Sequence, residues 1–227
     1  ADTTLVVELN AQPSYLIEWG KGIWDSVAVK SAGTVIPNIA AGVCGTDPGG
    51  LNTRFTFSAT AEAQKVDAMS RQSVPIVSGT LVPCIFRARL AIYDIGDAAA
   101  LDINVGLANG THATDADAIT ESVFFHLDGS SLNINAESDD GTTEVAATDT
   151  TVDAVDDTYF EVWIDARVES SIKLYVDGVR VLSGTTFTLA AASGPIKAIF
   201  HMEKTSDDTP ADVRVEKMDV RLMDIAA

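Results

Sequence analysis

The sequence predicts an all-β protein: an antiparallel two-sheet sandwich over residues 53–227, preceded by an extended arm or irregular subdomain over residues 1–52. From about residue 80 onward, apolar residues recur at every second position, which is the period of a strand with one buried face. Turns rich in Gly, Asp and Ser separate these segments, and none of the segments keeps the period of a helix. Closely spaced strands of this kind favour two stacked antiparallel sheets.

The alternating segments predict the strands in order along the chain. They cover residues 86–92, 101–107, 123–127, 132–136, 160–168, 172–176, 179–181, 196–202 and 213–222. Asp128-Gly129 joins the third segment to the fourth, and Asp177-Gly178 joins the sixth to the seventh, as in tight hairpins. Asp140-Gly141 marks a further turn. We therefore expect hairpins at both junctions.

Three regions depart from simple alternation. The alternation slips by one residue at Glu216-Lys217, which predicts a β-bulge in the last strand. We expect one short helix over Ala59–Ser70. Residues 1–52 combine a strand-like stretch at 5–9 with a segment at 34–50 that is rich in Gly, Ala and Pro, which is why an arm or irregular subdomain is expected there.

Charge excludes two classes of partner. The chain has 33 acidic and 15 basic residues, for a net charge of −18, and residues 1–90 hold equal numbers of each sign. An acidic body without a basic cluster repels phosphate backbones and anionic lipid, so we expect no nucleic acid and no membrane partner. The apolar stretches are too short to span a membrane, and the N-terminal residues lack the pattern of a signal peptide, so we expect no export.

The cysteines and histidines, which often bind metals or act as nucleophiles, do not indicate a site in this sequence. Cys44 and Cys84 stand 40 positions apart with no metal-ligand spacing, so they are either two buried thiols or a disulfide that ties the N-terminal segment to the sandwich. His112, His126 and His201 are scattered and form no convincing ligand set. Nucleophile motifs and phosphate-binding glycine loops are absent from the sequence.

Four stretches of the second half carry a resemblance to a known family. They are Tyr-Phe-Glu-Val-Trp-Ile-Asp at 159–165, Ile-Lys-Leu-Tyr-Val-Asp-Gly at 172–178, Pro-Ile-Lys-Ala-Ile-Phe at 195–200 and Val-Arg-Val-Glu-Lys-Met-Asp-Val at 213–220. This succession resembles the second half of concanavalin A-like, or laminin G-like, jelly rolls. The resemblance covers roughly residues 80–225 and implies a jelly-roll sandwich. It leaves the function open, because lectins, glycosidases and viral structural proteins share this fold.

A glycosidase of this fold needs two carboxyl groups that face one cleft. Glu161 and Asp165 project from the same face of a predicted strand, with Trp163 between them. The compact Glu-x-Asp-x-x-Glu motif of such glycosidases is absent from the sequence. Arg167 completes an ordinary polar face. We therefore expect a protein that is not an enzyme.

Calcium is the one cofactor that the sequence leaves open. Aspartates in predicted loops could supply oxygen ligands, and the weak candidates are Asp139, Asp140, Asp156 and Asp157. The spacing Asp-x-Asp-x-Asp-Gly of a calcium loop is missing, and Asp115 and Asp117 alternate once and then stop. Turn chemistry explains these aspartates equally well, because their side chains bond the neighbouring backbone. The expectation is no cofactor, with calcium as the alternative.

The chain as a whole resembles virion proteins of tailed bacteriophages, in particular capsid decoration or cement proteins. The resemblance implies a non-enzymatic structural protein that is made in the host cytoplasm and lies on the capsid exterior. Its implied partners are the major capsid protein and copies of itself, as a homo-oligomer. A carbohydrate-binding, lectin-like module that binds glycans, and a phage fibre or tail accessory protein, are the alternatives.

The uneven charge predicts an orientation for such a protein. A neutral first part can press against another chain, while the acidic remainder faces water. The predicted interface residues are apolar and lie in the N-terminal segment: Trp19, Ile23, Trp24, Val35, Ile36 and Ile39. The segment from Asp94 to Asp157 is expected to lie largely in solvent.

Overall fold

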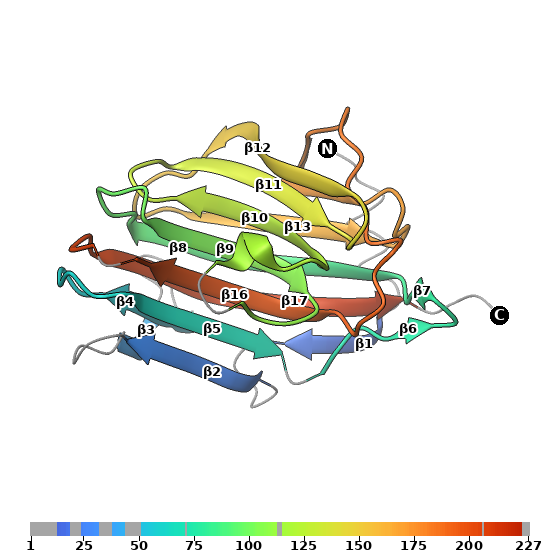
Figure 1. Cartoon of the computed structure of the whole chain (residues 1–227), viewed down its shortest axis with the longest axis horizontal. Coiled ribbons are helices and arrows are strands. Elements are labelled where there is room, and N and C mark those ends of the chain that lie inside the picture. Colours follow the sequence, from blue (N-terminus) through green and yellow to red (C-terminus); the bar gives the residue numbers. More distant parts are fainter. Residues whose placement is uncertain are drawn as a thin grey trace.

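Two antiparallel sheets packed face to face make up the fold (Figure 1). The computed structural model describes residues 53–70, 72–112, 115–205 and 207–223 in full, and only the backbone of residues 13–18, 24–31, 38–43 and 51–52. The predicted all-β, two-sheet sandwich is confirmed in these residues. They contain no helix that is long and apolar enough to cross a membrane.

One sheet has eight strands and the other has seven. The strands of the larger sheet are β1 (Pro13–Glu18), β3 (Asn38–Val43), β4 (Leu51–Phe57), β8 (Cys84–Asp94), β13 (Tyr159–Ala166), β14 (Lys173–Val176), β15 (Val179–Val181) and β17 (Ala211–Met223). The strands of the smaller sheet are β2 (Trp24–Ser31), β5 (Gln64–Ser70), β9 (Leu101–Ala108), β10 (Ser122–Asp128), β11 (Asn133–Asp139), β12 (Glu144–Asp153) and β16 (Lys197–Lys204). Two short strands, β6 (Ile76–Val77) and β7 (Thr80–Leu81), form a separate ribbon.

Strand order brings together segments that are distant in the sequence. The eight-stranded sheet runs β15-β14-β13-β8-β17-β4-β3, with β1 paired to β17, and the seven-stranded sheet runs β12-β11-β10-β9-β16-β5-β2. A 3₁₀ helix, η1 (Ala116–Ala118), lies over the outer face of the seven-stranded sheet (Figure 1). The loop that carries η1 connects β9 to β10, which are neighbours in that sheet.

The core lies between the two sheets and follows the predicted alternation. Phe86 and Leu90 on β8, and Val105 on β9, are fully buried in one continuous cluster. The rings of Phe55 and Phe200 stack across the sandwich with centroids 4.6 Å apart. Burial of each such side chain contributes about 1.5–3 kcal/mol, so this layer supplies the main stabilisation of the fold.

The predicted hairpins and bulge are confirmed. β10 pairs with β11 beyond Asp128-Gly129, and β14 pairs with β15 through Asp177-Gly178. Both residues of the second turn have positive φ, 47° and 76°, as a two-residue turn of this hand requires. The register of β17 against β8 shifts between Val215 and Lys217, at the predicted bulge.

The helix predicted over Ala59–Ser70 is wrong. Residues 64–70 form β5, which pairs with β16 on one side and β2 on the other. All seven residues of β5 are buried, because Val66 and Ala68 face the core while Lys65 and Asp67 join a buried polar network on the outer face. Lys65, Val66, Asp67 and Ala68 do alternate as in a strand, but the alternation is short and ends at Met69, which is why it gives a weak signal.

The N-terminal segment contributes strands to both sheets. β1 pairs with β17, β2 with β5, and β3 with β4. The division of the chain at residue 52 stays a prediction. The expectation that the segment from Asp94 to Asp157 lies largely in solvent is wrong for β9 and β10, which are inner strands of the seven-stranded sheet and almost entirely buried.

Candidate functional site

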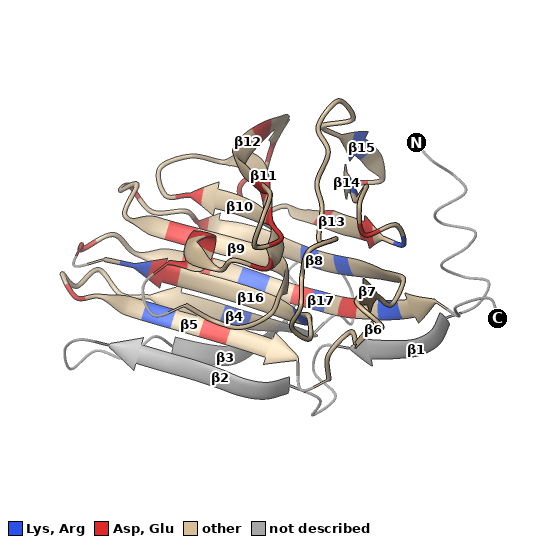
Figure 2. Ribbon diagram, turned by 45° about the vertical axis from the view of Figure 1, so that its right-hand side comes forward, with Lys and Arg blue, Asp and Glu red and all other residues tan. Residues whose placement is uncertain are grey.

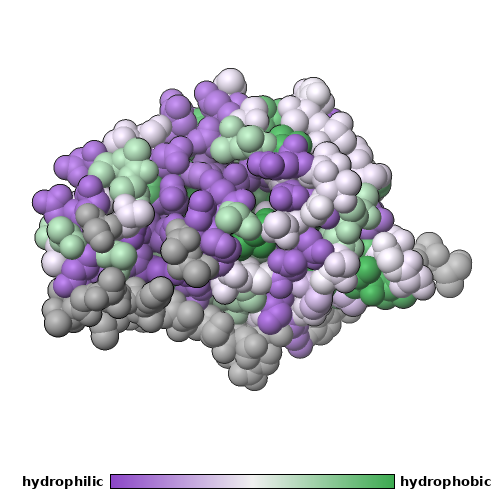
Figure 3. Space-filling model, in the orientation of Figure 1, coloured by the Kyte–Doolittle hydropathy of each residue, from purple (hydrophilic) through white to green (hydrophobic). Residues whose placement is uncertain are grey.

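A row of polar side chains crosses the outer face of the seven-stranded sheet. The register places His126 opposite Asn104, Asn104 opposite His201, and His201 opposite Asp67. Their neighbours along each strand point into the core, so these four side chains point outward. Each is nevertheless at most 3% exposed. In the space-filling view, the described surface around this row is mainly hydrophilic (Figure 3).

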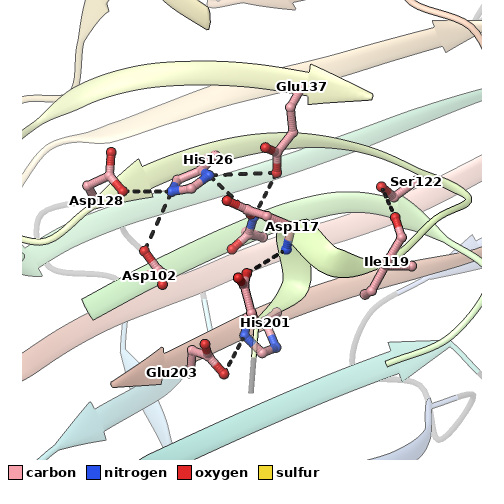
Figure 4. A network of polar contacts seen from close by, with 11 residues as sticks. Asp102, Asp117, Ile119, Ser122, His126, Asp128, Glu137, His201 and Glu203 are labelled. Carbon is pink, nitrogen blue, oxygen red and sulfur yellow. Dashed lines mark hydrogen bonds and ion pairs between the residues drawn. The ribbon is translucent and has the colours of Figure 1, made fainter. Parts of the chain in front are cut away.

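His126 lies at one end of the row and has a pair of carboxylates at each ring nitrogen (Figure 4). Nε2 lies 2.9 Å from Asp128 Oδ1 and 3.7 Å from Asp102 Oδ1. Nδ1 lies 3.2 Å from Asp117 Oδ1 and 3.6 Å from Glu137 Oε1. Nδ1 has no hydrogen-bond partner among the described residues.

The position of Asp117 depends on η1 and on Asn104. The Asp117 backbone N–H donates to Asp115 Oδ1 at 2.9 Å, which caps η1 and turns its first residues toward the sheet. Asn104 Nδ2 then donates to Asp117 Oδ1 at 2.7 Å and to Glu137 Oε1 at 3.0 Å. One fully buried amide therefore holds the two carboxylates that face Nδ1.

The environment separates the pKa values of these groups. Burial lowers the pKa of His126, but the carboxylates of Asp102, Asp117 and Glu137 outweigh burial and raise it well above its ordinary value. Burial raises the pKa of Asp117, but the hydrogen bond and charge of His126 bring it down to about 2. Burial and the charge of Asp117 raise the pKa of Glu137 to about 7. The chain thus holds two neighbouring carboxyl groups whose pKa values are shifted in opposite directions.

A second buried histidine lies further along the same face. His201 Nδ1 lies 2.6 Å from Asp67 Oδ1, and Nε2 lies 3.4 Å from Glu203 Oε2. Lys65 Nζ makes a further ion pair of 2.9 Å with Asp67. Burial lowers the pKa of His201, but the two carboxylates raise it above its ordinary value. This histidine completes a buried charge network rather than opening to a pocket.

A pocket of about 310 Å³ opens beside the His126 cluster. Its lining comes from η1, from β10 and β11, and from the edge strand β12: Asp117, Ser122, Glu137, Ser138, Asp139, Glu144, Val145, Ala146 and Ala147. The lining contains four acidic residues and neither Lys nor Arg, and β12 supplies a small apolar wall. Asp117 and Glu137 belong both to this pocket and to the set that faces His126 Nδ1.

Two sets of side chains could hold a metal ion, and they share His126. One set is Asp117, His126 and Glu137, and the other is Asp102, His126 and Asp128. Within each set the ligand atoms lie within 4.8 Å of one another. A neutral imidazole has one lone pair and one N–H, so the two sets cannot both bind a metal through this ring at the same time.

The calcium candidates from the sequence lie in turns. Asp140 is 3% exposed and accepts hydrogen bonds from the backbone of Thr142, Thr143 and Ala191. Asp139 Oδ1 accepts from the backbone N–H of the residue two positions on. Asp156 and Asp157 lie before β13, and no set of three potential ligands in the described residues includes any of the four. The structure therefore does not bring them together as a calcium site.

The predicted carboxylate pair, Glu161 and Asp165, lies on the outer face of the other sheet. Glu161 forms an ion pair with Arg87 and accepts from Trp163 Nε1. Asp165 accepts from Nε and Nη2 of Arg167 at 2.8 and 2.9 Å. Both carboxylates are thus engaged in ion pairs.

The remaining sequence predictions fall partly outside the described residues. The side chains of the predicted interface residues, Trp19, Ile23, Trp24, Val35, Ile36 and Ile39, lie outside them, and so does Cys44. Cys84 is a buried free thiol. Burial and the charge of Asp165 raise its pKa to about 12. The sequence did not predict the His126 cluster as a candidate site.

The two antiparallel sheets form a jelly-roll sandwich, as the resemblance implied. No family model matches the chain and no curated protein matches its sequence. Among solved structures, it is similar to a protein of unknown function from Shewanella oneidensis MR-1, at 8% identity and a TM-score of 0.59 over 98% of this chain and 94% of that chain.

Two further solved structures carry names that mention carbohydrate. The carbohydrate recognition domain of Emp47p matches at 9% identity and a TM-score of 0.56, over 93% of this chain and 96% of that chain. A carbohydrate esterase from Shiga toxin-encoding bacteriophage phi24B matches at 12% identity and a TM-score of 0.52, over 86% of this chain and 90% of that chain. At these identities the likeness shows the fold, and the site must carry the function.

Proposed function

We propose that this chain is a carbohydrate-binding, lectin-like module and that glycan binds in the pocket beside Asp117 and Glu137. The pocket lining carries the proposal. A sugar ring presents hydroxyl groups at its edge and C–H groups on its face, and the pocket offers carboxylate acceptors on one wall and Val145, Ala146 and Ala147 on the other. Its volume of about 310 Å³ lies at the lower end of the range for small-ligand pockets.

The charge of the pocket restricts the class of sugar. Four carboxylates line it without a basic residue, so an anionic sugar would meet repulsion at short range. The expected ligands are therefore neutral sugars or amino sugars rather than uronic or sialic acids. The fold supports the general class, because two of the structures it resembles bear names of carbohydrate-recognising or carbohydrate-modifying proteins.

A glycan array with matched variants tests the proposal. The array should contain neutral, amino and anionic glycans, with the full chain as probe. Ala146 is an exposed residue of the pocket wall, and Ala146→Trp should fill the pocket without disturbing the core. Val179→Trp is the matched control, because Val179 is 56% exposed on β15 in the other sheet.

The expected result is binding of neutral or amino glycans by wild type and by Val179→Trp, with at least tenfold weaker binding by Ala146→Trp. Equal binding by Ala146→Trp would place the glycan elsewhere. Absence of binding to every glycan would overturn the proposal. Release of reducing ends from a bound glycan would replace it by a glycan-cleaving activity, for which the separated pKa values of Asp117 and Glu137 would supply an acid and a base.

A virion structural role, with copies of itself as partners, is a second proposal that rests on the other sheet. Three arginines on its outer face stack over aromatic rings: Arg87 over Trp163, Arg89 over Tyr159 and Arg214 over Tyr93. Arg, Trp and Tyr are the residues most enriched at the centres of protein interfaces.

Sedimentation equilibrium tests this second proposal. The full chain should assemble beyond a monomer between about 1 and 100 µM, and Tyr159→Ala should weaken the assembly. Val168→Ala, at a 57% exposed position, is the control and should leave the assembly unchanged. A wild-type chain that stays monomeric throughout would remove self-association, and the homo-oligomeric virion role with it.

A further inference from the structure

The Nδ1 side of His126 requires a positive charge. Nδ1 is buried and has no hydrogen-bond partner among the described residues, while oxygens of Asp117 and Glu137 lie at 3.2 and 3.6 Å from it. If Nδ1 carried only a lone pair, three electron-rich atoms would face one another in a buried space, at high electrostatic cost. A proton on Nδ1 can supply the positive charge, and a metal ion can take the place of that proton.

The surroundings of this nitrogen are those of a metal ligand. The other ring nitrogen, Nε2, lies 2.9 Å from Asp128 Oδ1, and a ligating histidine usually donates its second N–H to such a carboxylate. Asn104 Nδ2 donates to Asp117 Oδ1 and to Glu137 Oε1, the same two oxygens that face Nδ1, so one amide fixes both beside the ring. The Oδ1 atom of Asn104 is itself buried without a partner. The three ligand atoms and the groups that orient them are therefore already in place.

We propose that His126 Nδ1, Asp117 and Glu137 bind one divalent transition-metal ion, with Zn²⁺ as the best fit. Imidazole with carboxylates is a ligand set that Zn²⁺ accepts, whereas calcium takes six to eight oxygen ligands. Zinc lies about 2 Å from each such ligand, so atoms within 4.8 Å of one another converge on one ion after small side-chain rotations.

The ion would keep a position open toward the pocket. Three protein ligands leave a fourth tetrahedral site, and Asp117 and Glu137 both line the pocket. A water molecule or a ligand hydroxyl could occupy that site. This inference does not rest on the proposed carbohydrate binding, since the metal alone is titrated without glycan.

Calorimetric titration of the chelator-treated full chain with ZnCl₂ tests the inference. The expected result is one Zn²⁺ per chain with a Kd below about 10 µM. Asp117→Asn is the main variant because its side chain is about a third exposed on a loop, so the fold should tolerate it. It should weaken binding at least a hundredfold, and thermal melting should verify that the variant is folded.

Two more variants separate the two ligand sets around His126. Asp128→Asn removes only the orienting carboxylate and should weaken Zn²⁺ binding about 10- to 100-fold. Asp102→Asn should leave the Kd within about tenfold of wild type. If Asp102→Asn abolishes binding while Asp117→Asn does not, the ion lies at Nε2 and the proposal is wrong.

Failure of the inference can be told apart from failure of the proposed function. Absence of saturable Zn²⁺ binding up to about 100 µM, or binding that none of the three variants changes, would overturn the metal site. Neither result would bear on glycan binding, which the glycan array tests separately.

Discussion

Asp140 is a position at which the sequence leaves two interpretations open, a calcium ligand or a residue that stabilises a turn. As a calcium ligand, its removal would abolish a response to calcium. In the structure its Oδ1 accepts from the N–H groups of Thr142 and Thr143 at 3.0 and 2.7 Å, and its Oδ2 from Thr188 Oγ1 and the Ala191 N–H at 3.2 and 3.3 Å. The carboxylate therefore ties the turn between β11 and β12 to residues 188–191.

The cost of Asp140→Asn follows from these four bonds. The amide oxygen can still accept from Thr142 and Thr143, and the new NH₂ group can donate to the Thr188 hydroxyl. The N–H of Ala191 then faces another donor and loses its acceptor. Loss of one hydrogen bond to a charged group costs about 1.5–3 kcal/mol, so we expect a destabilisation of about 2 kcal/mol. For a domain of this size that corresponds to a fall in Tm of about 4–8 °C.

The pH dependence has a definite sign. Burial raises the pKa of Asp140, but its bonds to Thr143, Thr142, Ala191 and Thr188 outweigh burial and lower it below 3.8. A carboxylate whose pKa is lowered on folding stabilises the fold above its unfolded pKa and loses this contribution as pH falls through the folded value. The stability difference between wild type and Asp140→Asn should thus be full at pH 7 and shrink below about pH 4.

Thermal melts with and without calcium distinguish a calcium ligand from a residue that stabilises the turn. Asp139→Asn is the matched control, because Asp139 keeps its single backbone bond through the amide oxygen and should cost less than about 0.5 kcal/mol. If Asp140→Asn has the same Tm as wild type, or if Asp139→Asn lowers the Tm as much as Asp140→Asn does, then Asp140 does not stabilise the fold by tying this turn to residues 188–191. A calcium-dependent rise in Tm that is lost in both variants would restore the calcium site.

Three further predictions concern single positions. The stability difference between wild type and His201→Gln, measured by denaturant titration, should be full below about pH 6.5 and decline at higher pH, because the two carboxylate partners raise the pKa of His201 on folding. Gly106→Ala should lower stability by at least about 3 kcal/mol because its Cβ would lie against the backbone of β10, whereas Gly110→Ala, with open space around it, should stay within about 0.5 kcal/mol. In a Cys44→Ser background, the Cys84 thiol should resist thiol reagents until the chain unfolds, since it is fully buried and its pKa is about 12; fast labelling of the native chain would contradict this.

The fold was predictable because its signals are local. Alternation of apolar residues and Asp-Gly turns identify strands such as β13 and hairpins such as β14–β15 within a few residues of chain. β5 was missed because its alternation covers only Lys65 to Ala68 and ends at Met69, too short a run to be recognised. The N-terminal strands were missed in part, because their partners β17 and β5 lie elsewhere in the sequence.

The candidate site was not predictable for a different reason. Alternation along the 123–127 segment already places His126 on the outer face of its strand. Its alignment with Asn104 and His201 depends on strand register between segments that are far apart in the chain, which periodicity does not give. Asp117 reaches Nδ1 from η1, in a connection whose only sequence signal was the Asp115 and Asp117 alternation.

The structure also changes the meaning of the uneven charge. The sequence suggested a neutral N-terminal part that docks and an acidic remainder that faces water. In the structure, both signs meet on β17 of the eight-stranded sheet, whereas β9, β10 and β11 of the other sheet carry Asp and Glu and neither Lys nor Arg (Figure 2). Antiparallel pairing of β8 with β17 places Arg87 beside Asp219 and Arg89 beside Lys217, so the first and last parts of the chain build one face together.

The two proposed roles are separated in space. The pocket and the His126 cluster lie on the outer face of the seven-stranded sheet, where β9, β10 and β11 are acidic, and the arginine–aromatic pairs lie on the outer face of the other sheet. Because the core lies between the two faces, a partner docked on the arginine-rich face would leave the pocket open to a glycan. A docking face whose charges are balanced by ion pairs avoids the repulsion that two acidic surfaces would meet. From the sequence alone, the same physical argument points to residues 1–90 as the docking part.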